Sequence, residues 1–165
     1  MIILGIDPGY AIVGWGILEY NGIKFRTISY GAINTTPDMP FSSRLEHIFD
    51  SLSTIIDKYR PECVAVEKLF FQNNQKTAID VGQARGVIIL ACQKARLQIS
   101  EYTPLQVKQS VVGYGRAEKK QIMEMTRILL NLKEVPKPDD TADALALAIC
   151  HGHSAGSLFN KLKKG

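Results

Sequence analysis

The first nine residues, Met1-Ile2-Ile3-Leu4-Gly5-Ile6-Asp7-Pro8-Gly9, decide the fold that we expect for this chain. Four apolar residues, three of them isoleucine, precede Asp7, and Pro8-Gly9 breaks the chain directly after it. Such a run, closed by a turn signal, predicts a strand that is buried on both faces of a sheet. A carboxylate at the end of that strand needs a basic partner or a metal ion, because burying an unpaired ion is costly.

Two further β-like runs follow the first one. Residues 12–20 alternate in polarity, residues 23–33 form another run of this kind, and Asn21-Gly22 lies between them. Asn-Gly between two such runs is the strongest short-range signal of a β-hairpin. We therefore expect these three strands to form an antiparallel meander, with the buried Asp7 strand central in the sheet. Gly14 and Gly16 in the second strand indicate close approach by another backbone or by a ligand.

A helix and a second buried strand come next. Ser43-x-x-Glu46 has the spacing of a capping box, and apolar residues then recur at three- and four-residue steps as far as Pro61, which predicts an amphipathic helix. Residues 63–67 form another short apolar run that ends in a carboxylate, Glu67. A strand that returns beside the first after a helix is parallel to it. Asp7 and Glu67 are therefore expected at the same edge of the sheet.

The rest of the chain predicts one more strand and four more helices. The strand is expected over residues 97–102, and the helices over residues 77–96, 104–112, 117–132 and 139–150. The prediction is an α/β domain with a mixed five-stranded sheet, an antiparallel meander plus parallel strands, flanked by helices. We place this domain at residues 1–153 and expect residues 154–165 to form a flexible basic tail.

Composition indicates a folded protein that suits a polyanionic partner. Of the 165 residues, 45% are hydrophobic and 22% are charged, which supports a sizeable core and argues against disorder. Lys and Arg outnumber Asp and Glu by 20 to 16, and the excess grows if several acids gather at one site. That balance suits nucleic acid.

Three features indicate a cytoplasmic protein with no membrane partner. The apolar stretches are too short to span a bilayer. No signal-type segment precedes the first strand. Cys63, Cys92 and Cys150 each lie among apolar residues without metal-type spacing, as small core residues do in a reducing compartment.

Four carboxylates stand in positions where burial or crowding makes them costly. Asp7 and Glu67 end neighbouring strands, and Asp140 and Asp143 are three residues apart in the first turn of the last predicted helix. Asp7 by itself can cap the Pro-Gly turn, and the last pair suits a helix N-terminus, where Asp139 or Asp140 can be the N-cap. Together they repel one another unless a cation lies among them.

The donor set of these four residues favours magnesium. Oxygen ligands without His or Cys select Mg²⁺ or Mn²⁺ rather than zinc. Several carboxylates can hold two such ions about 4 Å apart, an arrangement that stabilises the attacking and leaving oxygens of a phosphoryl displacement. We therefore expect two Mg²⁺ ions per site, replaceable by Mn²⁺, and phosphodiester hydrolysis by metal-activated water.

Several motifs, in this order and spacing, resemble those of the bacterial RuvC Holliday-junction resolvases. They are Gly5-Ile6-Asp7-Pro8-Gly9, Val66-Glu67, Gly82-Gln83-Ala84-Arg85-Gly86, Gln106-Val107-Lys108-Gln109, Ala117-Glu118-Lys119 and Asp140-Thr141-Ala142-Asp143-Ala144-Leu145. The resemblance implies an RNase H-like fold and a homodimer that nicks two opposed strands of four-way junction DNA with Mg²⁺. It also implies cooperation with a branch-migration motor, RuvA and RuvB, in recombination and repair.

The resemblance assigns roles to individual residues. It makes Asp7, Glu67, Asp140 and Asp143 the catalytic metal ligands and places Lys108 and Lys119 near the scissile phosphate. It implies that an aromatic residue at Phe70 stacks on junction bases, although the neighbouring Phe71 leaves open which ring does so. Arg116 and Lys120 are candidates for the DNA backbone path, and the tail lysines are weaker ones: Lys161, Lys163 and Lys164.

Three other functions remain open at this stage. Actin- and hexokinase-like ATPases share the strand-ending Asp followed by Gly, but they need a second lobe that 165 residues do not supply. An RNase H-like enzyme could act on RNA or on ordinary duplexes. A non-catalytic junction-binding protein would not need an intact set of four carboxylates.

The helix expected over residues 77–96 has a face with little side-chain bulk. Ala78, Gly82, Gly86 and Leu90 follow one another at four-residue steps, and residues 87–92 are apolar at every position. A helix that is apolar all round must be covered on more than one side. We expect the second cover to be the same helix of another subunit in a two-fold dimer. The alternative is that the late helices of the same chain cover it.

Overall fold

The opening stretch forms the central strand of the sheet. The computed structural model describes residues 1–69 and 75–162. Its strands are β1 (Ile2–Asp7), β2 (Ile12–Tyr20), β3 (Phe25–Asn34), β4 (Cys63–Glu67) and β5 (Gln98–Tyr102). The sheet has the order β3-β2-β1-β4-β5, with β1, β2 and β3 antiparallel and β4 parallel to both β1 and β5. The predicted mixed sheet is confirmed.

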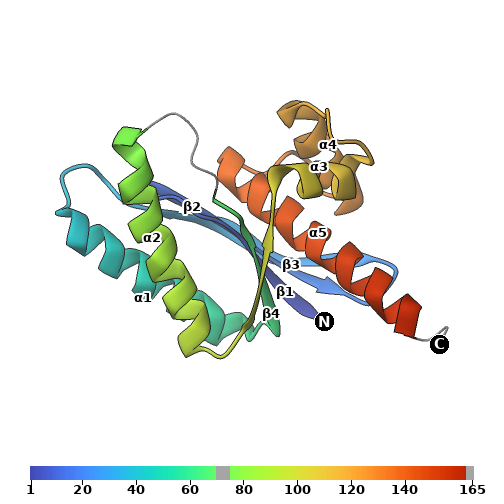
Figure 1. Ribbon diagram of the computed structural model, residues 1–165, viewed down its shortest axis with the longest axis horizontal. Coiled ribbons are helices and arrows are strands. Elements are labelled where there is room, and N and C mark those ends of the chain that lie inside the picture. The colour runs from blue at the N-terminus through green and yellow to red at the C-terminus, as the bar shows by residue number, and fades with distance from the viewer. Residues whose placement is uncertain (70–74, 163–165) are drawn as a thin grey trace.

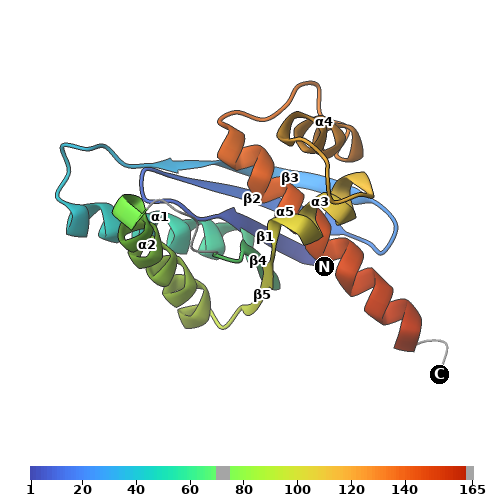
Figure 2. The same ribbon diagram turned by 45° about the horizontal axis from the view of Figure 1, so that its top comes forward.

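In the described part of the chain, five helices cover the two faces of this sheet. They are α1 (Phe41–Tyr59), α2 (Gln75–Lys94), α3 (Pro104–Val112), α4 (Lys119–Leu129) and α5 (Asp139–Leu162). Helices α1 and α2 lie on one face, and α5 crosses the other with α3 and α4 packed against it (Figures 1 and 2). None of these helices could span a lipid bilayer, since none combines enough length with enough apolar sequence.

Alternation along β1 and β4 determines which face each strand-ending carboxylate joins. In β1, Leu4 and Ile6 pack in the core beneath α1 and α2, while Ile3 packs in the core beneath α5. Because side chains alternate with a period of two, Asp7 follows Ile3 and Gly5 onto the α5 face. In β4 the same rule takes Glu67 to the face of Cys63, which also packs beneath α5. Both carboxylates therefore point toward the last helix.

Glycines let α5 lie directly on the sheet. A Cβ atom on Gly5 would lie 1.9 Å from the carbonyl oxygen of Ala144, and one on Gly14 would lie 1.9 Å from that of Asp140. One on Gly16 would lie 2.5 Å from the Leu145 side chain. Since real Cβ atoms do not approach so closely, these positions admit only glycine while α5 keeps its place. The close approach expected at Gly14 and Gly16 is therefore confirmed, and the partner is α5, through its backbone at Gly14 and through the Leu145 side chain at Gly16.

Several predicted details differ from the structure. The capping box at Ser43 is wrong, because Arg44 donates its backbone N–H to the carbonyl of Pro40 and thereby starts α1 at Phe41, so that Ser43 falls inside the first turn. Helix α4 starts at Lys119 rather than residue 117. Helix α5 continues to Leu162, beyond the helix end expected at residue 150, because its two glycines do not break it.

The three cysteines are unpaired and buried, as expected for core residues. Cys63 lies on β4, Cys92 on α2 and Cys150 on α5. Burial raises the pKa of the Cys92 thiol to about 12, so this thiol stays protonated at neutral pH. None of the three has the character of a reactive thiolate.

The close packing of α5 on β1 yields a prediction about Gly5. We expect Gly5→Ala to lower the free energy of unfolding by about 1–3 kcal/mol, because the added methyl group meets backbone atoms that cannot rotate away. Urea denaturation followed by circular dichroism measures the change. An unchanged midpoint would contradict the packing distance between α5 and β1.

Candidate active site

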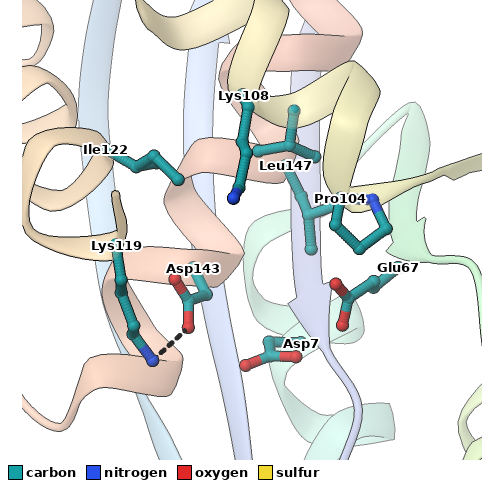
Figure 3. A pocket seen from close by; sticks show the side chains of 9 residues that line it. Asp7, Glu67, Pro104, Lys108, Lys119, Ile122, Asp143 and Leu147 are labelled. Atoms are coloured by element: carbon teal, nitrogen blue, oxygen red, sulfur yellow. Dashed lines mark ion pairs between the residues drawn. The ribbon is translucent and has the colours of Figure 1, made fainter. Parts of the chain in front are cut away.

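The ends of β1 and β4 meet α5, α3 and α4 at a cavity of about 210 Å³. Figure 3 shows carboxylates from two strands and one helix facing the same space, with lysines reaching in from two other helices. The residues that line the cavity are Asp7, Glu67, Pro104, Val107, Lys108, Lys119, Ile122, Asp143 and Leu147. Five of the six residues predicted to be catalytic therefore share one cavity.

Strand register brings Asp7 and Glu67 together. Ile6 on β1 pairs with Val66 on β4, so the next residue of each strand, a carboxylate in both cases, lies at the same edge of the sheet. This confirms the expectation drawn from the strand–helix–strand pattern. The third carboxylate, Asp143, comes from the opposite side of the cavity because α5 crosses above this edge (Figure 3).

Asp140 has a different position from the other three predicted ligands. It is not among the residues that line the cavity, although it is only one turn before Asp143 on α5. Its charge still reaches the site, since it contributes to raising the pKa of Asp7 and of Asp143. Three of the four predicted carboxylates line the cavity, and the fourth lies near it.

The carboxylates of the cavity are partly buried and repel one another, and the positive charge beside them does not offset these effects. Burial is the largest cause that raises the pKa of Asp7, followed by the charges of Glu67, Asp143 and Asp140, and together they move it from 3.8 to about 8. Burial and the charge of Asp143 also raise the pKa of Glu67. Burial raises the pKa of Asp143 as well. Lys119 opposes the rise at all three carboxyls without cancelling it.

Lys119 is the basic partner of this carboxylate group. Its Nζ lies 3.1 Å from Oδ2 of Asp143, the ion pair drawn in Figure 3. Burial lowers the pKa of Lys119, but the hydrogen bond to Asp143 and the charges of Asp143, Asp139 and Asp7 together outweigh burial and leave the pKa raised. The ammonium group is therefore charged at neutral pH.

Lys108 enters the cavity from α3. A capping box starts this helix: Gln106 donates its backbone N–H to the Thr103 hydroxyl at 3.1 Å, and the Gln106 side chain accepts from the Thr103 backbone at 2.8 Å. The cap fixes the first turn, so that Lys108 on the second turn points into the cavity (Figure 3). Both predicted lysines thus face the carboxylates.

Two of the predicted DNA contacts lie on the surface outside the cavity. Arg116 and Lys120 are both exposed there. Phe70, Phe71, Lys163, Lys164 and the side chain of Lys161 lie outside the part of the chain that the structure describes. The choice between the two phenylalanines stays a prediction.

Sequence reasoning missed two residues beside the site. Arg85 on α2 forms an ion pair with Glu101 on β5 and donates from Nε to the backbone carbonyl of Glu67 at 3.4 Å. Asp139, considered only as a helix cap, lies next to Lys119. The motif around Arg85 was visible in the sequence, but no local pattern showed that its side chain reaches the end of β4.

The donor set fits a hard divalent cation. The cavity offers carboxylate oxygens and excess negative charge, with no histidine or cysteine in its lining. Over residues 1–69 and 75–162, no three acidic, histidine or cysteine side chains are already close enough to hold an ion. Since Lys119 pairs with Asp143, binding of a cation there requires these side chains to rearrange.

The raised pKa of Asp7 yields a prediction about pH. The folded protein keeps this proton up to about pH 8, whereas the unfolded chain releases it near 3.8. With metal removed by a chelator, the free energy of unfolding should therefore decrease as pH rises from about 4 to about 8. Asp7→Asn should flatten this decrease and make the metal-free protein more stable than the wild type at the upper end.

Urea denaturation at several pH values in chelator measures this slope. Asp38→Asn serves as the control, because Asp38 is exposed on a loop and its pKa is lowered by a hydrogen bond from Thr36. This control should leave the slope between about pH 5 and about pH 8 unchanged. A wild-type slope that survives Asp7→Asn in full would contradict the assignment.

Comparison with known proteins identifies relatives of similar length. The family model described as crossover junction endodeoxyribonuclease RuvC matches residues 3–151. The RuvC protein of Halothermothrix orenii is 60% identical over 154 residues, 93% of each chain, and that of Ruminiclostridium cellulolyticum is 56% identical over the same length and coverage.

Solved structures agree with these sequence relatives. The chain matches the structure of Thermus thermophilus RuvC with a TM-score of 0.87 and 37% identity, covering 94% of this chain and 95% of that one. It matches T. thermophilus RuvC in complex with Holliday junction substrate with a TM-score of 0.86, 35% identity and the same coverage. The predicted RNase H-like fold is confirmed, and the chain belongs to the RuvC family of crossover junction endodeoxyribonucleases.

Proposed function

We propose that this protein resolves four-way (Holliday) DNA junctions by paired, metal-dependent phosphodiester hydrolysis. The observation that carries the proposal is the cavity into which Asp7, Glu67 and Asp143 converge with insufficient positive charge. Membership of the RuvC family supports the reaction class, and the T. thermophilus relative in complex with Holliday junction substrate supports the choice of DNA.

The carboxylates would hold Mg²⁺, with Mn²⁺ as a substitute. Asp7, Glu67 and Asp143 line the cavity and would be the main ligands, while Asp140 lies close enough to contribute charge or a further oxygen. When bound, two such ions would supply Lewis-acid activation of water and of the scissile phosphate. The rise in the pKa of Asp7 supports this assignment, since a cation would offset both the burial and the carboxylate repulsion that cause it.

The two lysines would act on the phosphate. An ammonium group is a point charge that suits a phosphate oxygen. A positive charge that is already in place where negative charge develops in the transition state contributes to catalysis. Lys108 and Lys119 approach the cavity from different helices, so a phosphate between them would be held from two directions. Arg116, Lys120 and an aromatic ring at Phe70 or Phe71 would contact the DNA farther from the bond that breaks.

Asp7→Asn tests the chemistry. We expect the single-turnover rate on a four-way junction in Mg²⁺ to fall by about a hundred-fold or more, because the variant loses a central carboxylate. Junction affinity should change little, since basic contacts with phosphate dominate binding. Gel-based nicking assays and fluorescence anisotropy measure the two quantities, with Asp38→Asn as the control.

Two outcomes would contradict the proposal. Strong residual cleavage by Asp7→Asn in Mg²⁺ would remove the metal role of this carboxylate. Equal rates on a matched linear duplex or an RNA–DNA hybrid would favour a general RNase H-like nuclease.

We also propose a two-fold homodimer formed through α2. Within the subunit, Ala84, Ile88 and Cys92 are buried against the core. On the other side Ile79 is 68% exposed and Leu90 is 53% exposed. Helices α3, α4 and α5 lie on the opposite face of the sheet, so they do not cover the outer side of α2 (Figures 1 and 2).

Small residues support this interface further. Added Cβ atoms on Gly82 and Gly86 would meet nothing within 4 Å, so residues 1–69 and 75–162 of the subunit leave this face open. Close approach of an identical helix would cover it in an isologous contact. Two active sites in such a dimer would act on opposed strands of a symmetric junction.

Light scattering at micromolar concentration tests the interface. We expect the wild type to be a dimer and Ile79→Asp combined with Leu90→Asp to be a monomer, because charges would be buried without partners. Ile23→Asp is the matched control, since Ile23 is apolar and 84% exposed but lies in the β2–β3 turn. A monomeric wild type that still makes paired, symmetric nicks would contradict this role of α2.

We propose that the enzyme acts in the cytoplasm with a branch-migration motor, RuvA and RuvB. Three unpaired, buried cysteines support a reducing compartment. The motor follows from family membership and is a proposal for this chain.

A further inference from the structure

Asp139 lies beside the active site but outside its cavity. It is the first residue of α5 and stands four residues before Asp143, so the two carboxylates lie on the same face of the helix. Its Oδ2 is 3.8 Å from Nζ of Lys119, and its Oδ1 is 2.9 Å from Nζ of Lys137. Lys119 therefore lies between two carboxylates, with Asp143 at 3.1 Å as the nearer one.

We propose that Asp139 is a positioning residue that keeps Lys119 at the mouth of the cavity when a divalent cation takes Asp143. This inference rests on the proposed function, because it requires a cation at the carboxylates. Asp139 does not line the cavity. Its charge also reaches Asp143 directly, so the test must separate that effect from the one that passes through Lys119.

Competition for Asp143 is the physical basis. A divalent cation and the Lys119 ammonium both require the Asp143 carboxylate, and they repel each other at short range. Without a second acceptor, displaced Lys119 would lose its ion pair and turn into solvent. Asp139 offers that acceptor one helical turn away, so a small rotation of the side chain exchanges one carboxylate for the other.

Lys137 shares the Asp139 carboxylate with Lys119. It occupies one oxygen of Asp139 and leaves the second for Lys119. The two lysines thus share one carboxylate without sharing an oxygen. Removing Lys137 should leave Asp139 more available to Lys119, whereas removing Asp139 should leave Lys119 with Asp143 alone.

Calorimetric titration of DNA-free protein with Mg²⁺ tests the proposal. We expect Asp139→Asn to weaken Mg²⁺ binding by about two- to five-fold, the range of partly exposed ion pairs, because Lys119 then competes harder for Asp143. In a Lys119→Gln background, which has no such competitor, the same substitution should change Mg²⁺ affinity little. This double-mutant cycle isolates the part of the effect that passes through Lys119.

Kinetics give an independent readout. Asp139→Asn should lower the single-turnover rate at saturating Mg²⁺ while leaving junction affinity unchanged, and Asp139→Glu should restore part of the rate. Lys137→Gln is the control, and its Mg²⁺ affinity should be unchanged or tighter.

Four results would overturn the proposal. Equal weakening by Asp139→Asn in both backgrounds would mean that Asp139 acts by its charge alone. No weakening in either, or an equal weakening by Lys137→Gln, would reduce Asp139 to a partner of Lys137. A wild type that binds no Mg²⁺ would overturn the metal site of the proposed function as well, which separates that failure from the other three.

Discussion

The contact between the backbone of α5 and the backbones of β1 and β2 is the constraint on which the active site depends. Gly5 and Gly14 leave no side chain between the helix and the strands, so the carbonyls of Ala144 and Asp140 lie where Cβ atoms would otherwise be. A helix on a sheet is normally held off by interleaved side chains. Here the missing side chains lower α5 onto the sheet and bring Asp143 within range of carboxylates that end two strands. Glycine at these positions therefore determines the geometry of the candidate active site as well as packing.

The resulting site trades stability for function. Bringing Asp7, Glu67 and Asp143 into one partly buried cavity raises the pKa of each, and Lys119 offsets only part of the repulsion. A structural site would pair these charges or replace them with apolar side chains. Because these carboxylates stay without enough positive charge, their repulsion raises the free energy of the folded protein, and a bound cation lowers it again. The same imbalance explains why lysines from α3 and α4 point inward rather than into solvent.

The sequence was informative wherever a local pattern determined the structure. The apolar runs ending in Asp7 and Glu67, together with Asn21-Gly22, were enough to predict the strands, their order around β1 and the shared edge of the two carboxylates. The pattern could not show that Asp143 lines the cavity while Asp140 does not, because this depends on how α5 is rotated about its axis where it packs on the glycines of the sheet. It also predicted the wrong start for α1. The spacing of Ser43 and Glu46 fits a capping box, although the carbonyl of Pro40 already accepts the first helical hydrogen bond. Asp139 and Arg85 were missed because their partners are distant in sequence or belong to another helix.

The two faces of the sheet separate chemistry from assembly, yet one side chain connects them. The α5 face carries the cavity, while the outer side of α2 carries the open surface that we assign to a second subunit. Arg85 projects from α2 to the carbonyl of Glu67 and pairs with Glu101 on β5, so it ties α2 to the ends of two strands. Any contact that shifts α2 therefore acts on the end of β4, where Glu67 is held. A dimer built on this helix would place its interface one side chain away from a catalytic carboxylate in each subunit, which gives a physical route by which assembly could order both active sites together.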